Sequence, residues 1–205
     1  MKIINNIILL FTSFILLTAC SNYERVQSPK NIKVNPNPSE KYLVTISAVE
    51  SVFPIHDVIA TTIYFVETNN LRKCSPIDMG RSIGGSWNSI DKNIVSKLIP
   101  TLDNQYQVIF VPNYFLDEAY YHMDVCHWVT WGLDFQFKRE NISYSAGMSY
   151  KDILDENNVT LQCETLKNVK NRESIGQRNC MIQDESNISV NYPIFKLSIK
   201  SKKIL

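Results

Sequence analysis

The side chains best suited to chemistry lie together in "LDEAYYHMDVCH", residues 116–127. Asp117, Glu118 and Asp124 carry carboxylates of the kind that perform acid–base work on sugars or bind calcium. Asp117 and Glu118 are adjacent, however, and adjacent residues of a strand point to opposite faces of a sheet. Neither an EF-hand spacing nor a phosphate-binding glycine loop accompanies them. The carboxylates therefore do not predict a catalytic pair or a calcium site.

Histidine chemistry is limited by number and by position. The sequence has 3 histidines: His56 in a predicted loop, and His122 and His127 on either side of Cys126. A metal site could draw on Cys126 and its two neighbours, but no CxxC or HxxxH spacing completes a ligand set. The glycines of "SIGGSW" do not reproduce the nucleophile elbow of serine hydrolases. We therefore expect no enzymatic activity, no metal and no cofactor.

The remaining cysteine chemistry is disulfide formation. Cys74, Cys126, Cys163 and Cys180 are an even set, as expected of a protein that folds in an oxidising compartment. Three pairings are possible, and we expect the sequential one, Cys74–Cys126 and Cys163–Cys180. The chain-entropy treatment assigns these two loops about 4 and about 3 kcal/mol of stabilisation.

A fifth cysteine, Cys20, ends an N-terminal apolar run. The run from Ile7 to Leu17 has 11 residues, whereas a membrane-spanning helix needs roughly 20, so it is typical of a signal peptide. The "LTAC" that follows resembles the bacterial lipobox. That resemblance implies cleavage of residues 1–19, a diacylglyceryl group on the Cys20 thiol and acylation of the new amine. Ser21 resembles an outer-membrane sorting signal, so we expect a lipid-anchored protein of the outer membrane that faces the periplasm.

Net charge argues against nucleic acid as a partner. Removal of residues 1–19 removes one lysine, which leaves 20 basic residues against 20 acidic ones and a formal charge of zero. Nucleic-acid binding relies on an excess of basic side chains that contact phosphates. The basic C-terminal "KLSIKSKK" alternates with apolar residues, as the solvated face of a strand does. We expect a protein partner, and contact with the membrane only through the lipid anchor.

The chain divides into an anchor segment and one domain. Residues 20–40 contain Pro29, Pro36 and Pro38 without apolar periodicity, which predicts a flexible tether after the acylated cysteine. Residues 41–205 predict a single domain of short strands rich in β-branched and aromatic residues. The fold class that we expect is all-β: a two-sheet antiparallel β-sandwich of immunoglobulin- or transthyretin-like type.

Individual elements can be placed within this sandwich. "CHWVTWGLDFQF" predicts a strand with Leu133, Phe135 and Phe137 inward, and the segments that flank Asp103-Asn104 predict a β-hairpin. "CSPIDMGRSIGGSW" predicts a long loop. "SYKDILDE" predicts one short helix with Ser149 as its N-cap. Residues 164–187 are polar, and we expect an irregular C-terminal excursion that the Cys163–Cys180 disulfide closes.

Aromatic residues crowd the segment that contains the acidic cluster. Aromatic side chains are over-represented at protein interfaces and among their hot spots. The alternative is that about half of these rings fill the core and pack over the disulfide, Trp128 and Trp131 above all. Our candidate partner-binding residues are Tyr114, Phe115, Asp117, Glu118, Tyr120 and Tyr121.

The segment "VPNYFLDEAYYHMDVCHW", residues 111–128, resembles a group of small proteobacterial lipoproteins. The group shows a leucine, an acidic pair, a tyrosine pair and then Cys-x-Trp, and the likeness extends over roughly residues 41–155. The residues that carry it are Leu116, Asp117, Glu118, Tyr120, Tyr121, Cys126 and Trp128.

We associate this lipoprotein group with gene clusters of type VI secretion effectors, in which lipoproteins act as immunity proteins. The resemblance implies a binding module that neutralises a secreted toxin such as a type VI lipase. The alternatives are a structural or assembly lipoprotein that binds a secretion-system or envelope component, and a small-ligand carrier or enzyme.

Overall fold

The computed structural model describes residues 27–49, 54–78, 85–87, 89–101, 105–164, 178–182 and 194–205. The predicted signal peptide, Cys20 and the first residues of the predicted tether lie outside these ranges. Among the helices in these ranges, none is long and apolar enough to cross a membrane. The elements are β1 (Tyr42–Val49), β2 (His56–Val66), α2 (Thr68–Cys74), β3 (Ile77–Asp78), β4 (Ser86–Trp87), β5 (Asp91–Lys97), β6 (Tyr106–Phe110), β7 (Trp128–Arg139), β8 (Ile142–Ser149), α3 (Tyr150–Leu154), β9 (Asn158–Glu164), β10 (Arg178–Asn179), β11 (Met181–Ile182) and β12 (Ile194–Lys203).

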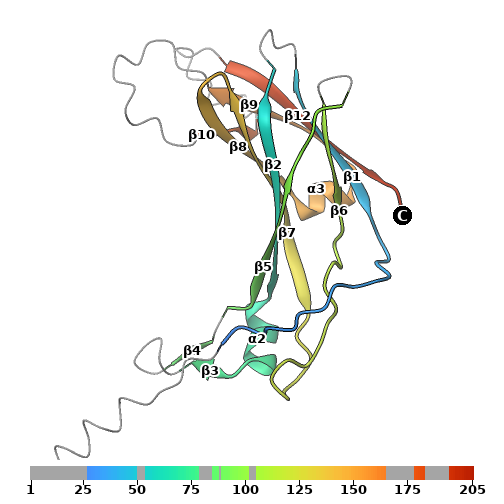
Figure 1. The fold of residues 1–205 in the computed structure, drawn as a ribbon, viewed down its shortest axis with the longest axis vertical. Coiled ribbons are helices and arrows are strands. Elements are labelled where there is room, and N and C mark those ends of the chain that lie inside the picture. Colours follow the sequence, from blue (N-terminus) through green and yellow to red (C-terminus); the bar gives the residue numbers. More distant parts are fainter. Residues whose placement is uncertain are drawn as a thin grey trace, which may run out of the picture.

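Two five-stranded sheets face each other, and the predicted all-β sandwich is confirmed (Figure 1). One sheet has the order β11-β9-β12-β1-β6, and we call it the β1 sheet. The other, the β2 sheet, has the order β10-β8-β7-β2-β5. Neighbouring strands are antiparallel except for β10, which runs parallel to β8. The β3–β4 pair lies apart from both sheets, near α2.

The main core fills the space between the sheets. Alternating residues of β1, among them Val44 and Ile46, are buried from one side. Leu133, Phe135 and Phe137 of β7 are buried from the other side, as their alternation predicts. Burial of one face in each sheet is what makes the period of two visible in the sequence.

The predicted helix and its cap are present as α3. The Ser149 hydroxyl accepts a hydrogen bond from the Asp152 amide at 3.1 Å, which is an N-cap interaction. Ile153 is fully buried in the main core, and the Ser201 hydroxyl donates to its carbonyl at 2.8 Å. The cap and one buried side chain thus explain how a helix of 5 residues persists.

The predicted hairpin around Asp103-Asn104 is reduced to one antiparallel bridge, between Pro100 and Tyr106, and the strands β5 and β6 do not pair with each other. β5 pairs with β2, whereas β6 pairs with β1, so the two strands belong to different sheets. Buried Tyr106 of β6 reaches across the sandwich, where its hydroxyl donates to the carbonyl of Ile55, the residue before β2, at 2.9 Å. Strand pairing depends on which buried faces meet, and a local turn signal does not determine it.

A second hydrophobic cluster lies where β2 and β7 extend beyond the main core, toward α2 (Figure 1). The Cys74–Cys126 disulfide, predicted from the sequence, joins the last residue of α2 to the segment that precedes β7. Helix α2 was not predicted from the sequence. We call this group the second cluster; its buried members are Tyr64, Val66, Leu71, Cys74, Ile90, Phe115, Cys126 and Trp128.

The other predicted disulfide, Cys163–Cys180, is also present. Cys163 belongs to β9 of the β1 sheet. Cys180 lies between β10, which pairs with β8 of the β2 sheet, and β11, which pairs with β9. The disulfide therefore fastens a short segment that lies against one edge of both sheets. The rest of the predicted excursion falls outside the ranges given above.

Part of the predicted tether, within residues 27–40, contacts the domain. Val34 pairs with Phe115, and the Leu116 amide donates to the Lys33 carbonyl at 3.0 Å. Ile32 packs against the second cluster. These residues contribute an extended strip with its own backbone hydrogen bonds, which the proline-rich composition does not reveal.

Candidate protein-binding surface

The predicted aromatic candidates are brought together, and they face the second cluster. Phe115 is buried and packs edge-on against Tyr64 and Tyr114, with ring centroids 5.2 and 5.0 Å apart. Tyr114 stacks on Tyr64 at 5.7 Å. Phe115 also contacts the Trp128 ring at 5.0 Å. For these rings the packing alternative is the better description.

The predicted acidic candidates have intramolecular partners. Asp117 accepts a hydrogen bond from the Trp128 amide at 2.9 Å and lies 2.8 Å from Nδ1 of His127. Glu118 forms an ion pair with Lys33 at 2.6 Å. Asp117 therefore orders the start of β7, and Glu118 helps to hold the N-terminal strip.

The two tyrosine hydroxyls behave in the same way. The Tyr120 hydroxyl accepts from Nε1 of Trp128 at 2.9 Å and donates to the Leu116 carbonyl at 3.1 Å. The Tyr121 hydroxyl donates to the Gln27 carbonyl at 2.9 Å. Burial raises the pKa of both hydroxyls. All six candidates thus support the fold around Trp128, and their role in partner binding stays a prediction.

Trp131 differs from Trp128, and the expectation that it packs inside is wrong. Trp128 is 8% exposed, whereas Trp131 is 70% exposed. The cause is a β-bulge: Thr62 pairs with Leu133 and Tyr64 with Thr130, so two residues of β7 oppose Ile63 alone. The face that β7 presents to the protein interior therefore changes at the bulge, and Trp131 is left on the outside.

Gly132 makes the bulge possible. Its φ is +130°, and a Cβ at this position would lie 2.2 Å from the Met148 carbonyl oxygen and 2.8 Å from the Tyr150 nitrogen. Only glycine combines this backbone conformation with this close approach. An isolated glycine inside a strand pattern is the sequence signal for a bulge, and it was the signal available for placing Trp131 outside.

Trp131 is the centre of an apolar patch on the solvent face of the β2 sheet. Its ring stacks on Phe65, with centroids 4.6 Å apart and an interplanar angle of 18°. Val95 on β5 is 62% exposed; it pairs with Thr61 of β2 and is therefore a diagonal neighbour of Ile63 on the same face. Contiguous exposed apolar surface of this kind marks interaction sites, whereas scattered single residues do not. We call this surface the outer patch; its members are Ile63, Phe65, Val95, Val129 and Trp131.

Two hollows flank the Trp131 ring. The larger, of about 780 Å³, extends toward α2 and β4 and is lined by Phe65, Trp87, Trp131 and Tyr150 among others. We call it the groove. Glu67 adds an exposed carboxylate at its margin. The groove is open and mostly apolar, as expected of a surface that receives part of another chain.

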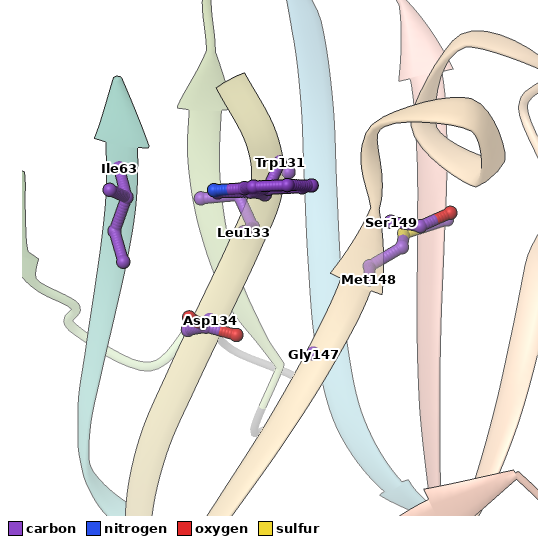
Figure 2. Close-up of a pocket in the computed structure, with 8 residues that line it drawn as sticks. Ile63, Trp131, Leu133, Asp134, Gly147, Met148 and Ser149 are labelled. Atoms are coloured by element: carbon purple, nitrogen blue, oxygen red, sulfur yellow. The ribbon is translucent and has the colours of Figure 1, made fainter. Parts of the chain in front are cut away.

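The smaller hollow, of about 220 Å³, lies on the other side of Trp131. Figure 2 shows that its residues come from three neighbouring strands: Ile63 from β2, Trp131 and Asp134 from β7, and Gly147 with Ser149 from β8. Gly147 pairs directly with Asp134 across the ladder. A Cβ at position 147 would lie 3.1 Å from Oδ1 of Asp134, so glycine leaves the space beside the carboxylate open.

Asp134 is the acidic group of this hollow. Within the described part of the chain, no hydrogen bond or ion pair reaches its carboxylate. Partial burial raises the pKa of this carboxyl above its ordinary value. A carboxylate that loses water without gaining a partner destabilises the free protein, which is a feature of binding sites.

The two hollows are lined by aromatic, aliphatic, hydroxyl and carboxylate side chains. The residues that line them include no histidine and no cysteine. Across the ranges that the structure describes, no three His, Cys, Asp or Glu side chains gather around one point.

Comparisons with known proteins add no identification. No protein-family model, no curated protein and no solved structure matches this chain. Function must therefore be argued from the residues and the geometry of the outer patch.

Proposed function

We propose that this protein is a binding module that captures another protein on the outer patch. The observation that carries the proposal is Trp131, a large ring that a glycine bulge keeps 70% exposed beside two hollows. Tryptophan is the residue type most enriched among interface hot spots. Without the bulge, the alternation of β7 that buries Leu133, Phe135 and Phe137 would place the Trp131 side chain inside as well.

The sequence supports a location for this module. The "LTAC" at residues 17–20 favours a lipid anchor on Cys20 and a position on the periplasmic face of the outer membrane. Gln27, which accepts the bond from Tyr121, is seven residues from Cys20. Seven residues span no more than about 25 Å. An acylated Cys20 would therefore keep the second cluster, and the outer patch beside it, close to the membrane surface.

The partner that fits this arrangement is a toxin that acts at the membrane. We propose that the protein is an immunity lipoprotein that neutralises a secreted effector such as a type VI lipase. Anchoring raises the local concentration of the inhibitor where such an enzyme works, which strengthens capture without additional contacts. The resemblance of residues 111–128 to lipoproteins of effector clusters supports the same assignment.

Site-specific photo-crosslinking in intact cells tests the binding surface. A photoreactive phenylalanine replaces Val95 in the outer patch, and a matched variant carries it at Ile109, an exposed aliphatic residue of the β1 sheet. We expect one defined adduct from position 95 and none from position 109. Equal adducts from both positions, or none from position 95, would refute the outer patch as the binding surface.

The identity of the adduct then separates two functions. A secreted toxin supports the immunity proposal, and deletion of the gene should make cells sensitive to sister cells that deliver this toxin. A secretion-machine subunit or another envelope protein would instead establish a structural or assembly lipoprotein. Mass spectrometry of the native protein tests the anchor, because an unmodified Cys20 would contradict it.

A further inference from the structure

We infer that the small hollow beside Trp131 receives an arginine side chain of the partner protein, with its guanidinium against the Trp131 ring and the Asp134 carboxylate. The inference rests on the proposed function, because it names the group through which the partner is recognised. It concerns the hollow lined by Ile63, Trp131, Asp134, Gly147 and Ser149 (Figure 2).

The size of the hollow fits one side chain. Its volume is about 220 Å³, whereas sites for whole small molecules usually enclose about 300–1,000 Å³. Gly147 lies opposite Asp134, and the missing side chain keeps the carboxylate accessible from the β8 side. The hollow is therefore shaped for a projecting group that reaches the carboxylate past the Trp131 ring.

The charge of the hollow is uncompensated within the described ranges. The directly opposed residues are Thr61 on β2 and Gly147 on β8, and neither is a cation. Lys138 shares this face of β7, but it forms an ion pair with Asp57 at 3.1 Å. The site presents one negative charge without an internal counter-ion, so the complementary partner group is positive.

An aromatic ring beside a carboxylate favours arginine over lysine. The guanidinium is planar, so it can stack on an indole while its edge donates two parallel hydrogen bonds to a carboxylate. Cation–π contacts are strongest on tryptophan and more often involve arginine. The chain itself uses the same pairing elsewhere, where the Arg72 guanidinium lies 5.0 Å from the centre of the Trp87 ring.

Nuclear magnetic resonance of the full-length protein in detergent micelles tests the inference. The probe is the capped tripeptide Gly-Arg-Gly, compared with the same peptide carrying citrulline, a neutral isostere, or lysine. We expect the arginine peptide to shift the indole Nε1–H signal of Trp131. The corresponding signal of Trp128, whose Nε1–H is already bonded to Tyr120, should not move. Binding should weaken severalfold for lysine and further for citrulline.

Three variants locate the effect. Asp134→Asn removes the charge at constant shape, and we expect about threefold to fivefold weaker binding, as for a partly exposed ion pair. Gly147→Val fills the hollow at constant charge and should abolish binding, while Asp124→Asn, an exposed acid outside the hollow, should change nothing. If Gly147→Val does not fold, the Asp134→Asn comparison decides the matter alone.

The failure of this inference differs from the failure of the proposed function. Equal binding of the arginine and citrulline peptides, tighter binding of lysine, or no effect of Asp134→Asn would overturn the arginine site. A specific adduct from position 95 would still support the binding module in that case. Conversely, the arginine peptide could bind as expected while position 95 gives no adduct. That result would refute the outer patch as the binding surface in cells, but it would not contradict the arginine site.

Discussion

Replacement of each of two tryptophans by alanine gives a direct test of the bulge in β7, because the rings lie three residues apart in opposite environments. Trp128 is 8% exposed, packs on Phe115 and donates from Nε1 to Tyr120. Truncation of such a buried ring costs about 3–5 kcal/mol. A fully buried aromatic side chain loses roughly 150–250 Å² of solvent-accessible surface on folding. Trp131 is 70% exposed, so its side chain loses only about a third of that area. At about 25 cal/mol/Å², this is about 1–2 kcal/mol.

Urea denaturation followed by far-ultraviolet circular dichroism measures both losses without relying on tryptophan fluorescence. We expect Trp128→Ala to lower the free energy of unfolding by about 2 kcal/mol more than Trp131→Ala does, with similar dependence on urea. Trp131→Phe, which keeps a ring for Phe65 to stack on, serves as the conservative control. Equal losses, or a larger loss at position 131, would show that the Trp131 ring packs inside and that the outer patch is not a surface.

Three further perturbations test other parts of the structure. Gly132→Ala should lower the free energy of unfolding by about 2–4 kcal/mol. The strained φ alone costs about 1–3 kcal/mol, and the added Cβ would meet the backbone of β8 and α3. A loss below about 1 kcal/mol in a urea titration would argue against the bulge. Replacement of Cys74 and Cys126 together by serine should cost about 4 kcal/mol relative to the oxidised wild-type protein, for a sequence separation of 52; reduction of the wild-type protein, which also breaks Cys163–Cys180, should cost more. Asp134→Asn should stabilise the protein at neutral pH. The pKa of the Asp134 carboxyl is raised above 3.8 in the folded state, so wild-type stability falls as pH rises through the interval above 3.8. The melting temperatures of Asp134→Asn and of the wild-type protein should therefore differ at pH 7 and become equal toward pH 3. A lower stability of Asp134→Asn than of the wild-type protein at pH 7 would contradict a carboxylate without a partner.

Much of the fold is determined by local patterns that the sequence carries openly. Alternation places Leu133, Phe135 and Phe137 inside, because one face of the β2 sheet is buried and the period of a strand is two. The Ser149 cap needs only a hydroxyl within reach of an amide three residues later. The sequential disulfide pairing was one of three possibilities, and the structure confirms it.

Helix α2 shows where local patterns stop being sufficient. Asn70 is a poor helix former, yet its side chain accepts from the His127 amide at 2.6 Å and donates to the Val125 carbonyl at 3.0 Å. These bonds, with burial of Leu71 and the disulfide at Cys74, come from chain more than fifty residues away. No propensity within residues 68–74 encodes them.

The sequence by itself determined the class of the fold, the inward position of Leu133, Phe135 and Phe137, the cap of α3 and the pairing of the disulfides. Only the tertiary structure decided the pairing of β5 with β2, the docking of residues 27–40 and the exposure of Trp131. The physical reason is the same in each case. Periodicity and capping act within a few residues, whereas strand partners and the phase of β7 after Gly132 depend on contacts between segments distant in the chain. The proposed binding surface belongs to the second kind.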